Sequence, residues 1–425
     1  MRWIEKPSLR YAGAVIILAL ILGGGAGQGI WTDHLLELAL IPALFFGLAG
    51  LWSNRLDGPA RLLAIAFLLV IFIQFVPVMR TIPLIGERAI GFWSPAPQKS
   101  LEAGLFAIAG LGFFLYVALM SERERARLVP YFLIGLFVQA TVAVVQLSFS
   151  HSVTVTGVLP FDVRTGLFAN ENHFSTLFFA MIPLLAYSLI VRRESVLGYV
   201  AVCLLMVGIL FAVGSRAGMG ISSAIAVLSL IWFAPVRNKR FAKVSALVIA
   251  ALGLVSVVWI FGSSSSLEGD QRWILFVTTL QGIKDHWLAG SGLGTFTMIY
   301  PTYEDAEYII GTYANHAHND YLEIILELGL AGGILLIGYF VLLFRAAFRS
   351  ELSQAAFFSI AAICLHSIVD YPLRTMALTI MLAYLSTLVL ARREDPELER
   401  DGKAERRPRG SSRRLSPARS RTSHS

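Results

Sequence analysis

Long apolar segments recur along the whole chain and limit what it can fold into. A helix needs about 20 mostly apolar residues to cross the hydrocarbon core of a bilayer. The sequence holds about twelve segments of that kind, at 12–30, 35–52, 61–79, 101–120, 129–149, 174–191, 196–213, 217–234, 243–261, 322–344, 353–369 and 373–391. The composition agrees, because 56% of the 425 residues are hydrophobic and only 15% are charged. We therefore predict an all-α polytopic membrane protein with about twelve transmembrane helices.

The short connections between these segments indicate the orientation of the chain. If the N-terminus is cytoplasmic, the inner connections carry 16 basic residues and the outer ones carry 8, as the positive-inside rule requires. An even number of spans returns the C-terminus to the cytoplasm. Residues 392–425 then add 11 basic residues against 6 acidic ones, and this tail is too poor in apolar residues to form a packed core. A cleaved signal peptide at the first segment is the minority alternative.

One long connection, residues 262–320, is expected on the periplasmic side. Long loops in compact proteins are usually functional or disordered, and this one contains "QRWILFVTTLQGIKDHWLAGSGLGTF", with apolar residues at helical intervals. We therefore expect a small, mostly helical cap. The predicted parts are a membrane bundle of nine spans at 1–261, the periplasmic cap loop at 262–320, the last three spans at 321–391 and a disordered basic cytoplasmic tail at 392–425.

Polar chemistry gathers just ahead of the tenth segment, in "YANHAHNDYLEIILELGLAGG". Asp320 and Glu323 form a capping-box pattern that predicts a helix beginning at Tyr321. His318 would then lie at the outer mouth of the bundle. A helix end that is merely capped and solvated by its polar residues is the plainer alternative.

Two glutamates of the same segment are harder to explain as capping residues. Glu323 and Glu327 share one helical face. A carboxylate that faces lipid is costly, so this face should point into the protein or into a wet cavity. The segment therefore carries its polar groups toward the protein interior.

Arginines on the predicted outer side look toward the same place. Arg216 lies in the short turn "AVGSRAGMG", Arg272 lies in "GDQRWILF", and "HSIVDYPLR" supplies His366, Asp370 and Arg374. Each arginine alone fits a structural ion pair or a headgroup anchor. Several guanidiniums and a histidine around one outer cavity fit a membrane-embedded diphosphate better, because a guanidinium binds phosphate oxygens through a planar fork of donors.

These motifs resemble those of the O-antigen ligase and polysaccharide polymerase superfamily. "HNDYLEIILELGLAG" is similar to its signature of a His-Asn pair, nine residues and Gly-x-x-Gly, at His318, Asn319, Gly329 and Gly332. "GLFANENHFSTLF" resembles its Gly-x-x-x-Asn-x-Asn segment, and "GSRAG" and "DQRW" resemble its two arginine motifs. The four motifs occur in the family's order between residues 166 and 374.

The resemblance implies a glycosyltransferase on the outer face of the bacterial inner membrane. Such an enzyme passes a glycan from an undecaprenyl diphosphate carrier to an acceptor hydroxyl of a glycan, a lipid A core or a protein. It needs no cofactor, no metal and no nucleic acid. His318 would be the catalytic base, and Arg216 and Arg272 would bind the diphosphate. The supporting residues would be Asn170, Asn172, Asn319, Asp320, Glu323 and Arg374.

Two other function classes stay open on sequence alone. His316, His318 and Asp320 would share one face of an extended segment and could bind a transition metal, although no further ligand set recurs. A transporter or flippase of lipid-linked glycan would also explain twelve spans, although no inverted repeat is visible. Cys203 and Cys364 lie in apolar segments and offer neither a disulfide nor a thiolate metal site. Ligase and polymerase are not distinguished by the sequence.

Overall fold

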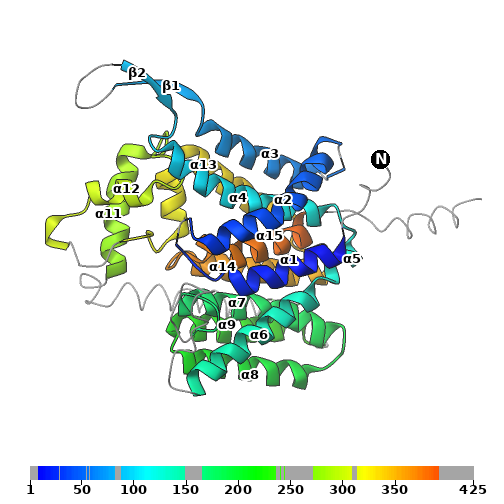
Figure 1. Ribbon diagram of the computed structural model, residues 1–425. Coiled ribbons are helices and arrows are strands. Elements are labelled where there is room, and N and C mark those ends of the chain that lie inside the picture. The colour runs from blue at the N-terminus through cyan, green and yellow to red at the C-terminus, as the bar shows by residue number, and fades with distance from the viewer. Residues whose placement is uncertain are drawn as a thin grey trace, which may run out of the picture. The chain divides into compact units, whose positions relative to one another are not determined.

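The computed structural model is almost entirely helical (Figure 1). It describes residues 8–148, 165–235, 271–308 and 314–391, apart from 28, 54, 57 and 82–87, together with residues 240 and 244. The predicted span 243–261, apart from residue 244, and the predicted tail 392–425 lie outside the described residues, as does part of the predicted cap loop.

The elements follow one another as helices joined by short turns, with one hairpin. They are α1 (Leu9–Leu22), α2 (Trp31–Trp52), α3 (Gly58–Ile73), β1 (Pro77–Thr81), β2 (Arg88–Phe92), α4 (Pro97–Ala118), α5 (Glu122–Ala126), α6 (Val129–Ser148), α7 (Glu171–Ala186), η2 (Tyr187–Val191), α8 (Val196–Val213), α9 (Arg216–Phe233), α11 (Gln271–His286), α12 (Phe296–Ile299), η4 (Tyr300–Thr302), η5 (Ala306–Tyr308), α13 (Asp320–Ala346), α14 (Glu351–His366), η6 (Pro372–Arg374) and α15 (Met376–Leu390).

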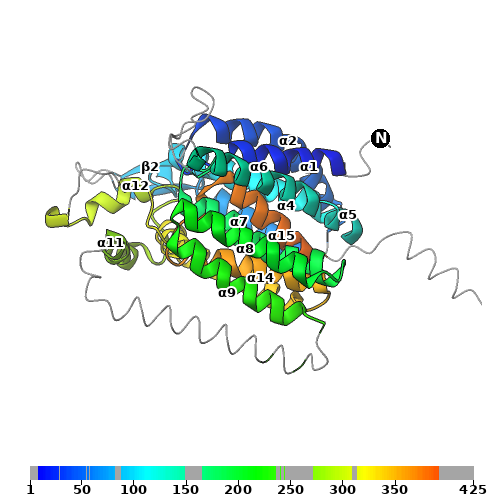
Figure 2. The ribbon, with the colours of Figure 1, turned by 90° about the horizontal axis from the view of Figure 1, so that it is seen from below.

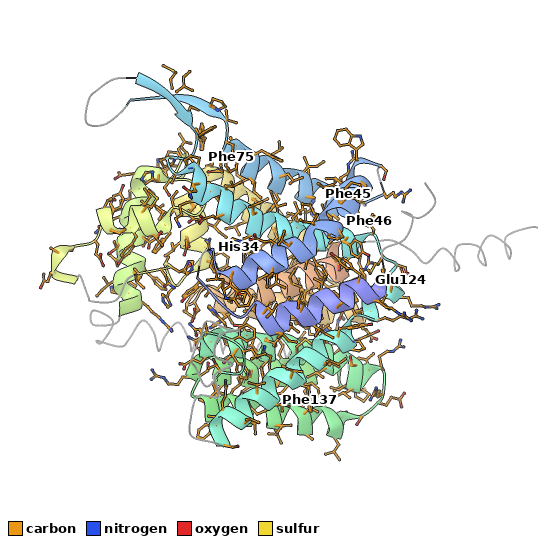
Figure 3. All side chains as sticks on the ribbon, viewed as in Figure 1. His34, Phe45, Phe46, Phe75, Glu124 and Phe137 are labelled. Carbon is orange, nitrogen blue, oxygen red and sulfur yellow. The ribbon has the colours of Figure 1, made fainter. Side chains whose placement is uncertain are left out.

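Most of these helices are apolar enough for a bilayer. Within the described part of the chain, seven are long enough to cross a membrane, and α1, α3, α14 and α15 are shorter apolar helices. They overlap eleven of the twelve predicted segments. Large apolar side chains also point away from the bundle, among them Phe45 and Phe137 (Figure 3). The predicted class, an all-α polytopic membrane protein, is confirmed.

Two local predictions were wrong. The first segment ends as a helix at Leu22 rather than near residue 30, because Gly23 packs on the start of α15 and Gly24 on the loop before α7. Ala377 N donates to Gly23 O at 3.0 Å, and a Cβ on Gly24 would clash with the carbonyl oxygen of Leu167. The end of the third predicted segment is a strand instead: β1 and β2 pair as an antiparallel hairpin with Met79 opposite Ile90.

The centre of the bundle is built around α7, which is the most buried of the candidate spans. It packs on α9 and α14, while α15 packs on α4 and α14 (Figure 2). Because helix direction alternates, one end of the bundle collects the N-termini of α7, α9, α13 and α15 and the C-terminus of α14. Hydrogen bonds join these ends directly, such as Asp320 N to Ser367 O at 3.0 Å.

Helix α13 is interrupted at Gly329, whose φ of 57° and ψ of −141° are not helical. This left-handed conformation suits glycine, which has no Cβ. The interruption lets the segment after α11 approach closely, because Ser291 N donates to Leu326 O at 2.8 Å and Gly292 N donates to Glu327 O at 2.9 Å. The glycine of the sequence signature therefore has a structural role, which is to break α13 just below its polar first turns.

Replacing Gly329 with alanine is expected to lower the free energy of unfolding by about 1–3 kcal/mol. The new Cβ would meet Gly290 N at 2.5 Å, and the backbone is strained for any residue with a side chain. Denaturant unfolding in detergent micelles measures the change. Gly333→Ala is the matched control, since nothing lies within 4 Å of a Cβ there. Equal stability of the two variants would contradict the prediction.

Candidate active site

A single carboxylate, Asp370, organises the polar end of the bundle. It lies in the turn after α14 and is completely buried. Asn172 Nδ2 on the first turn of α7 donates to Asp370 Oδ2 at 2.7 Å, and Arg272 Nη2 on the first turn of α11 lies 3.7 Å from the same oxygen. The backbone amide of Tyr371 donates to Oδ1 at 2.8 Å. Elements distant in sequence thus meet at one acidic side chain.

Three histidines surround the same carboxylate. The nitrogen-to-oxygen distances from Asp370 are 3.4 Å for His173, 3.9 Å for His318 and 4.0 Å for His366. His173 and His366 are fully buried, and His366 Nδ1 also contacts Thr176 Oγ1 at 2.8 Å. Burial raises the pKa of Asp370, but the adjacent His173, with His366 and His318, outweighs that effect and holds the pKa below its ordinary value. Asp370 is therefore a carboxylate in this site.

Among the charged or ionisable side chains that contact Asp370, His318 and Arg272 reach the surface. The side chain of His318 is 24% exposed and that of Arg272 is 37% exposed, whereas Asp370 and the other two histidines are 0% exposed. The buried groups can hold and orient these two side chains. A substrate approaching from outside would meet an imidazole and a guanidinium.

His318 is held in an uncommon backbone conformation. Its φ is 50°, one of two positive values among described residues other than glycine, and such strain persists only where the surroundings fix it. Burial lowers the pKa of His318 to about 4, against the opposing field of Asp370. The imidazole is therefore neutral near pH 7 and can accept a proton.

Tyr371 separates the histidines of the site. Its ring lies 4.8 Å from that of His173, 4.5 Å from that of His316 and 4.6 Å from that of His318, with nearly perpendicular planes for His173 and His318. Burial raises the pKa of Tyr371, while hydrogen bonds from Asn315 and Asn170 act in the opposite direction. Asn170 therefore reaches the site through the tyrosine hydroxyl, besides capping α7 with its side chain.

Arg216 adjoins the site through its neighbour in sequence. Helix α8 ends at a left-handed Gly214, and Ser215 caps α9, which begins at Arg216. Ser215 Oγ also donates to Asn172 Oδ1 at 3.2 Å, one bond away from Asp370. The Arg216 side chain is exposed, so it is the more accessible of the two predicted phosphate ligands.

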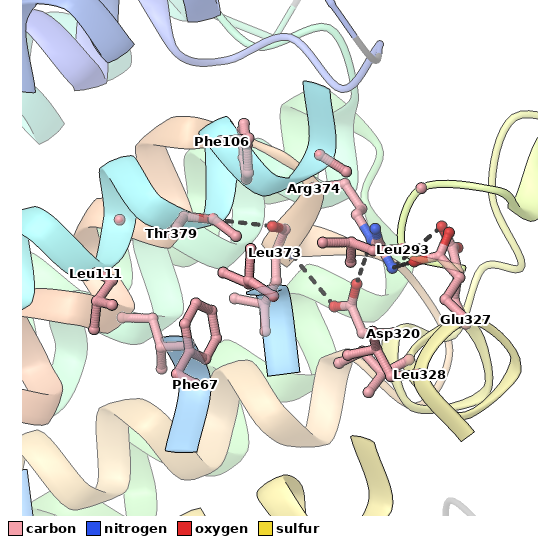
Figure 4. A pocket seen from close by; sticks show the side chains of 18 of the residues that line it. Phe67, Phe106, Leu111, Leu293, Asp320, Glu327, Leu328, Leu373, Arg374 and Thr379 are labelled. Carbon is pink, nitrogen blue, oxygen red and sulfur yellow. Dashed lines mark hydrogen bonds and ion pairs between the residues drawn. The ribbon is translucent and has the colours of Figure 1, made fainter. Parts of the chain in front are cut away.

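A second polar group lies beside the first and is centred on Arg374 (Figure 4). This guanidinium lies 3.8 Å from Asp320, 3.2 Å from Glu323 and 3.5 Å from Glu327. All three carboxyl groups are on the first segment of α13 and are at most 2% exposed. The prediction that this helical face points into the protein is confirmed.

His316 belongs to this second group. Its Nδ1 lies 2.9 Å from Glu323 Oε1, and its Nε2 lies 3.0 Å from the carbonyl oxygen of Ala26. Glu323 Oε2 also accepts from the backbone amide of Ala317 at 2.9 Å. Glu323 thus fixes the two residues that precede His318 and so helps to position the imidazole.

The capping-box prediction was wrong by one residue. Asn319, not Asp320, caps α13, because its side chain accepts from the amides of Tyr321 and Leu322, both at 3.0 Å. Its amide group also donates to Ile368 O at 2.8 Å, which ties the helix start to the turn that carries Asp370. Glu323 is released from capping its own helix and holds the loop instead.

An apolar cavity of about 350 Å³ opens beside the Arg374 group. Residues of α3, α4, α13 and α15 line its body, among them Phe67, Phe106 and Leu111 (Figure 4). Arg374 and Asp320 stand at its polar end. Its apolar lining and polar end suit a hydrocarbon chain with a polar end group.

The structure brings together many, though not all, of the residues singled out from the sequence. His318, Arg272 and Asn172 meet at Asp370, while Asp320, Glu323 and Arg374 form the adjacent group. Asn170 and Asn319 cap helices next to the site. The sequence analysis noted Asp370 and His366 beside Arg374 in "HSIVDYPLR" but assigned them no role, and it missed His173.

The arrangement required by the metal alternative is not formed by His316, His318 and Asp320. His316 contacts Glu323, His318 lies near Asp370, and Asp320 accepts from Ser367 Oγ at 2.8 Å. In the portion of the chain that the structure describes, no group of three or more His, Cys, Asp or Glu side chains is placed to hold a metal ion.

The fold and site together define a multi-pass membrane protein with a polar, histidine-rich centre at one end of its bundle. Residues 201–337 match the family model for O-antigen ligase. This region is therefore similar to the O-antigen ligase superfamily, and the resemblance of the motifs to that family is confirmed. The match includes Arg216, Arg272 and His318, whereas Asp370 and Asn172 lie outside it. Comparison with curated proteins found no match.

This similarity indicates a glycan-transfer function in the synthesis of envelope polysaccharides by a bacterial membrane protein. The family implies a lipid-linked glycan donor and a glycan acceptor. The chemistry of the site is the basis for a more specific assignment.

Proposed function

We propose that the protein is a glycosyltransferase that works at the periplasmic face of the bacterial inner membrane. It transfers a glycan from an undecaprenyl diphosphate carrier to an acceptor hydroxyl, in O-antigen ligation or polysaccharide polymerisation. One observation carries the proposal: His318 and Arg272 reach the surface while both contact the buried Asp370. A base and a phosphate ligand are thereby held side by side.

The transfer reaction needs a proton acceptor and a stabilised leaving group. Neutral His318 takes the proton of the acceptor hydroxyl as its oxygen bonds to the anomeric carbon of the donor sugar. The bond from that carbon to the diphosphate oxygen breaks, and the electron pair leaves with the carrier diphosphate. Arg272 and Arg216 stabilise this charge through guanidinium hydrogen bonds.

The remaining site residues position this pair. Asn172 and Asp370 hold Arg272 and the imidazole from beneath, and Asn170 contacts the Tyr371 hydroxyl. Asn319 fixes the start of α13. Asp320, Glu323 and Arg374 support the loop before His318 through the contacts described above.

The apolar cavity supports a lipid-linked substrate. Its hydrocarbon-like lining lies within the bundle, and its polar end is next to the loop that carries His318. A soluble nucleotide sugar has no hydrocarbon chain that could occupy such an apolar cavity. The carrier is therefore the donor type that fits the surroundings of the site best.

A reconstituted assay tests the proposal against the transporter alternative. Purified protein in liposomes, given a lipid-linked glycan and an acceptor glycolipid without any ion gradient, should form a covalent product. An acceptor of the lipid A core type yields ligation, whereas a second carrier-linked glycan yields a longer chain. Movement of the donor across the bilayer without a joined product would support a flippase and overturn the transferase.

Cysteine labelling should show that the site faces the periplasm. A single cysteine at Asp305, in the exposed segment after η4, is expected to react with a membrane-impermeant maleimide in cells whose outer membrane alone is permeabilised. A single cysteine at Glu351, at the exposed start of α14, should react only after the inner membrane is opened. The opposite pattern would reverse the orientation given by positive-inside counting.

A further inference from the structure

Helix α11 exposes an apolar stripe although it lies outside the bundle of spans. Trp273 is 44% exposed, Val277 37% and Leu280 46%, and their spacing places them on one face of the helix. The other side of the helix, with the buried Thr278 and Thr279 and the partly buried Leu275, packs on α13 and its neighbours. Apolar side chains thus occupy the exposed face as well as the packed one, unlike in a helix whose exposed face meets water.

The direction of α11 is also unlike that of the spans. It runs across the long axes of the bundle helices in Figure 1 and is seen nearly end-on in Figure 2, where α7, α8 and α9 lie across the view. A helix that crosses the spans in this way lies parallel to the membrane plane. Its apolar stripe can therefore meet the bilayer along its whole length.

The stripe continues into the lipid-facing surface of α13. Trp287 and Leu288, just beyond the end of α11, are exposed, and Leu288 O accepts from Leu330 N at 3.3 Å. Leu330 and Ile334 begin an exposed apolar row on the membrane-spanning part of α13. Since that row must face acyl chains, Trp287 and Leu288 lie at the level where the acyl chains begin.

One charged side chain on the stripe is compatible with a position at the boundary between headgroups and acyl chains. Lys284 follows Leu280 on the exposed face, one turn before Trp287. A lysine can keep its stem among apolar groups and extend its ammonium group to the phosphate level. Tryptophan rings are enriched at that interface, and α11 has one at its start while a second follows its end.

We propose that α11 is an interfacial helix, embedded through its Trp273, Val277 and Leu280 face in the leaflet next to the site. Its partner is the phospholipid bilayer itself, at the boundary between headgroups and acyl chains. The 262–320 connection is then not a cap above the membrane in this part but a component of the membrane surface.

This placement fixes the height of Arg272. The guanidinium is one residue before Trp273, so the helix holds it in the layer where lipid phosphates lie. If the proposed function is right, the donor diphosphate reaches Arg272 by moving sideways within the leaflet, without being lifted into water. That last point rests on the proposed function, whereas the embedding of α11 does not.

Spin-label depth measurements in lipid nanodiscs test the embedding. Labels are placed singly at Val277, Leu280, Phe45 and Asp305 in a chain whose Cys203 and Cys364 are replaced. Phe45 on α2 is an exposed residue of a span and reports the acyl-chain region, and Asp305 reports water. Labels at Val277 and Leu280 should be relaxed more strongly by oxygen than by a water-soluble nickel complex, as at Phe45.

Accessibility to the nickel complex like that at Asp305 would overturn the proposal, because the stripe would then face water. The native fold of each labelled variant is checked by its monodisperse elution in detergent. If the labels are embedded but the protein joins no glycan in the transfer assay, the result contradicts the proposed function and still supports the interfacial helix. The two ideas therefore fail separately.

Discussion

His318→Ala is expected to insert and fold normally while the rate of glycan transfer falls by about 10²–10⁴-fold, the usual contribution of a general base. Removal of the imidazole leaves no buried charge without a partner, because Asp370 keeps its contacts with Asn172 and Arg272. If His318 were only a helix-end residue, its loss would cost at most about 1–2 kcal/mol of stability and little activity. Initial rates with purified protein in liposomes measure the effect, and unfolding in detergent measures stability.

The pH profile of kcat/KM provides a second readout, because it reports the pKa of the base in the free enzyme. The pKa of His318 is lowered to about 4, so the neutral form persists as pH falls and is lost only near that value. We expect kcat/KM to stay level from pH 7.5 to about pH 5. A decline centred near 6.5 would point to an ordinary, solvated histidine instead.

The choice of control histidine changes in the light of the structure. His316 is outside the family pattern, but it is buried and bonded to Glu323, so His316→Ala would also disturb the loop before His318. His286 is better suited, since it lies in the last turn of α11, outside both polar groups and outside the cavity lining, with its ring 6.3 Å from that of Tyr303. His286→Ala should keep nearly full activity. Equal loss in both variants would remove the special role of His318.

Asp370→Asn is expected to reduce transfer by about 10²–10⁴-fold, although the residue is too deeply buried to meet substrate. The amide keeps the size of the side chain but removes the negative charge that faces three histidines and Arg272. His318 and Arg272 lose their shared anchor. Asp370→Ala should in addition lower the stability by about 3–5 kcal/mol, because partners of a buried charge are left unpaired.

Two measurements separate positioning from folding at this residue. Asp370→Asn should elute from detergent like the wild type and keep most of its unfolding free energy, while its rate falls. Asp285→Asn, an exposed carboxylate on α11 that accepts from Tyr303 at 2.9 Å, serves as the control and should change neither quantity much. Full activity of Asp370→Asn would mean that the histidines need no anionic centre.

The membrane helices could be predicted from sequence because length and hydropathy alone decide whether a segment suits a bilayer. The places where this reasoning failed involve contacts between distant segments. Leu22 ends its helix because Gly24 packs on the loop at Leu167, and the β1–β2 hairpin forms beside the loop that follows α11, where Trp93 donates to Ala289 O at 3.1 Å. The hydropathy of a segment does not indicate which distant segments will pack against it.

The candidate site was predicted in part for a similar reason. His318, Arg216 and Arg272 could be selected because their motifs resemble those of a known superfamily. Asp370 could not be selected with the same weight, since a lone aspartate after an apolar run resembles any polar turn. The role of Asp370 becomes apparent only when packing brings the ends of α7, α11, α13 and α14 together. The local sequence pattern does not reveal that packing.

The Arg374 group has a consequence for how this protein can change over time. One guanidinium lies within 3.8 Å of three carboxyl groups. Each of the four buried charges is therefore stabilised by the opposite charge beside it. Substitutions at Asp320, Glu323, Glu327 and Arg374 are therefore strongly non-additive, since neighbours in one network couple. An arginine lost here leaves surplus negative charge, which a second loss among the carboxyl groups relieves. These positions are expected to drift as a coordinated set, and homologues that lack the arginine should also lack some of its acids.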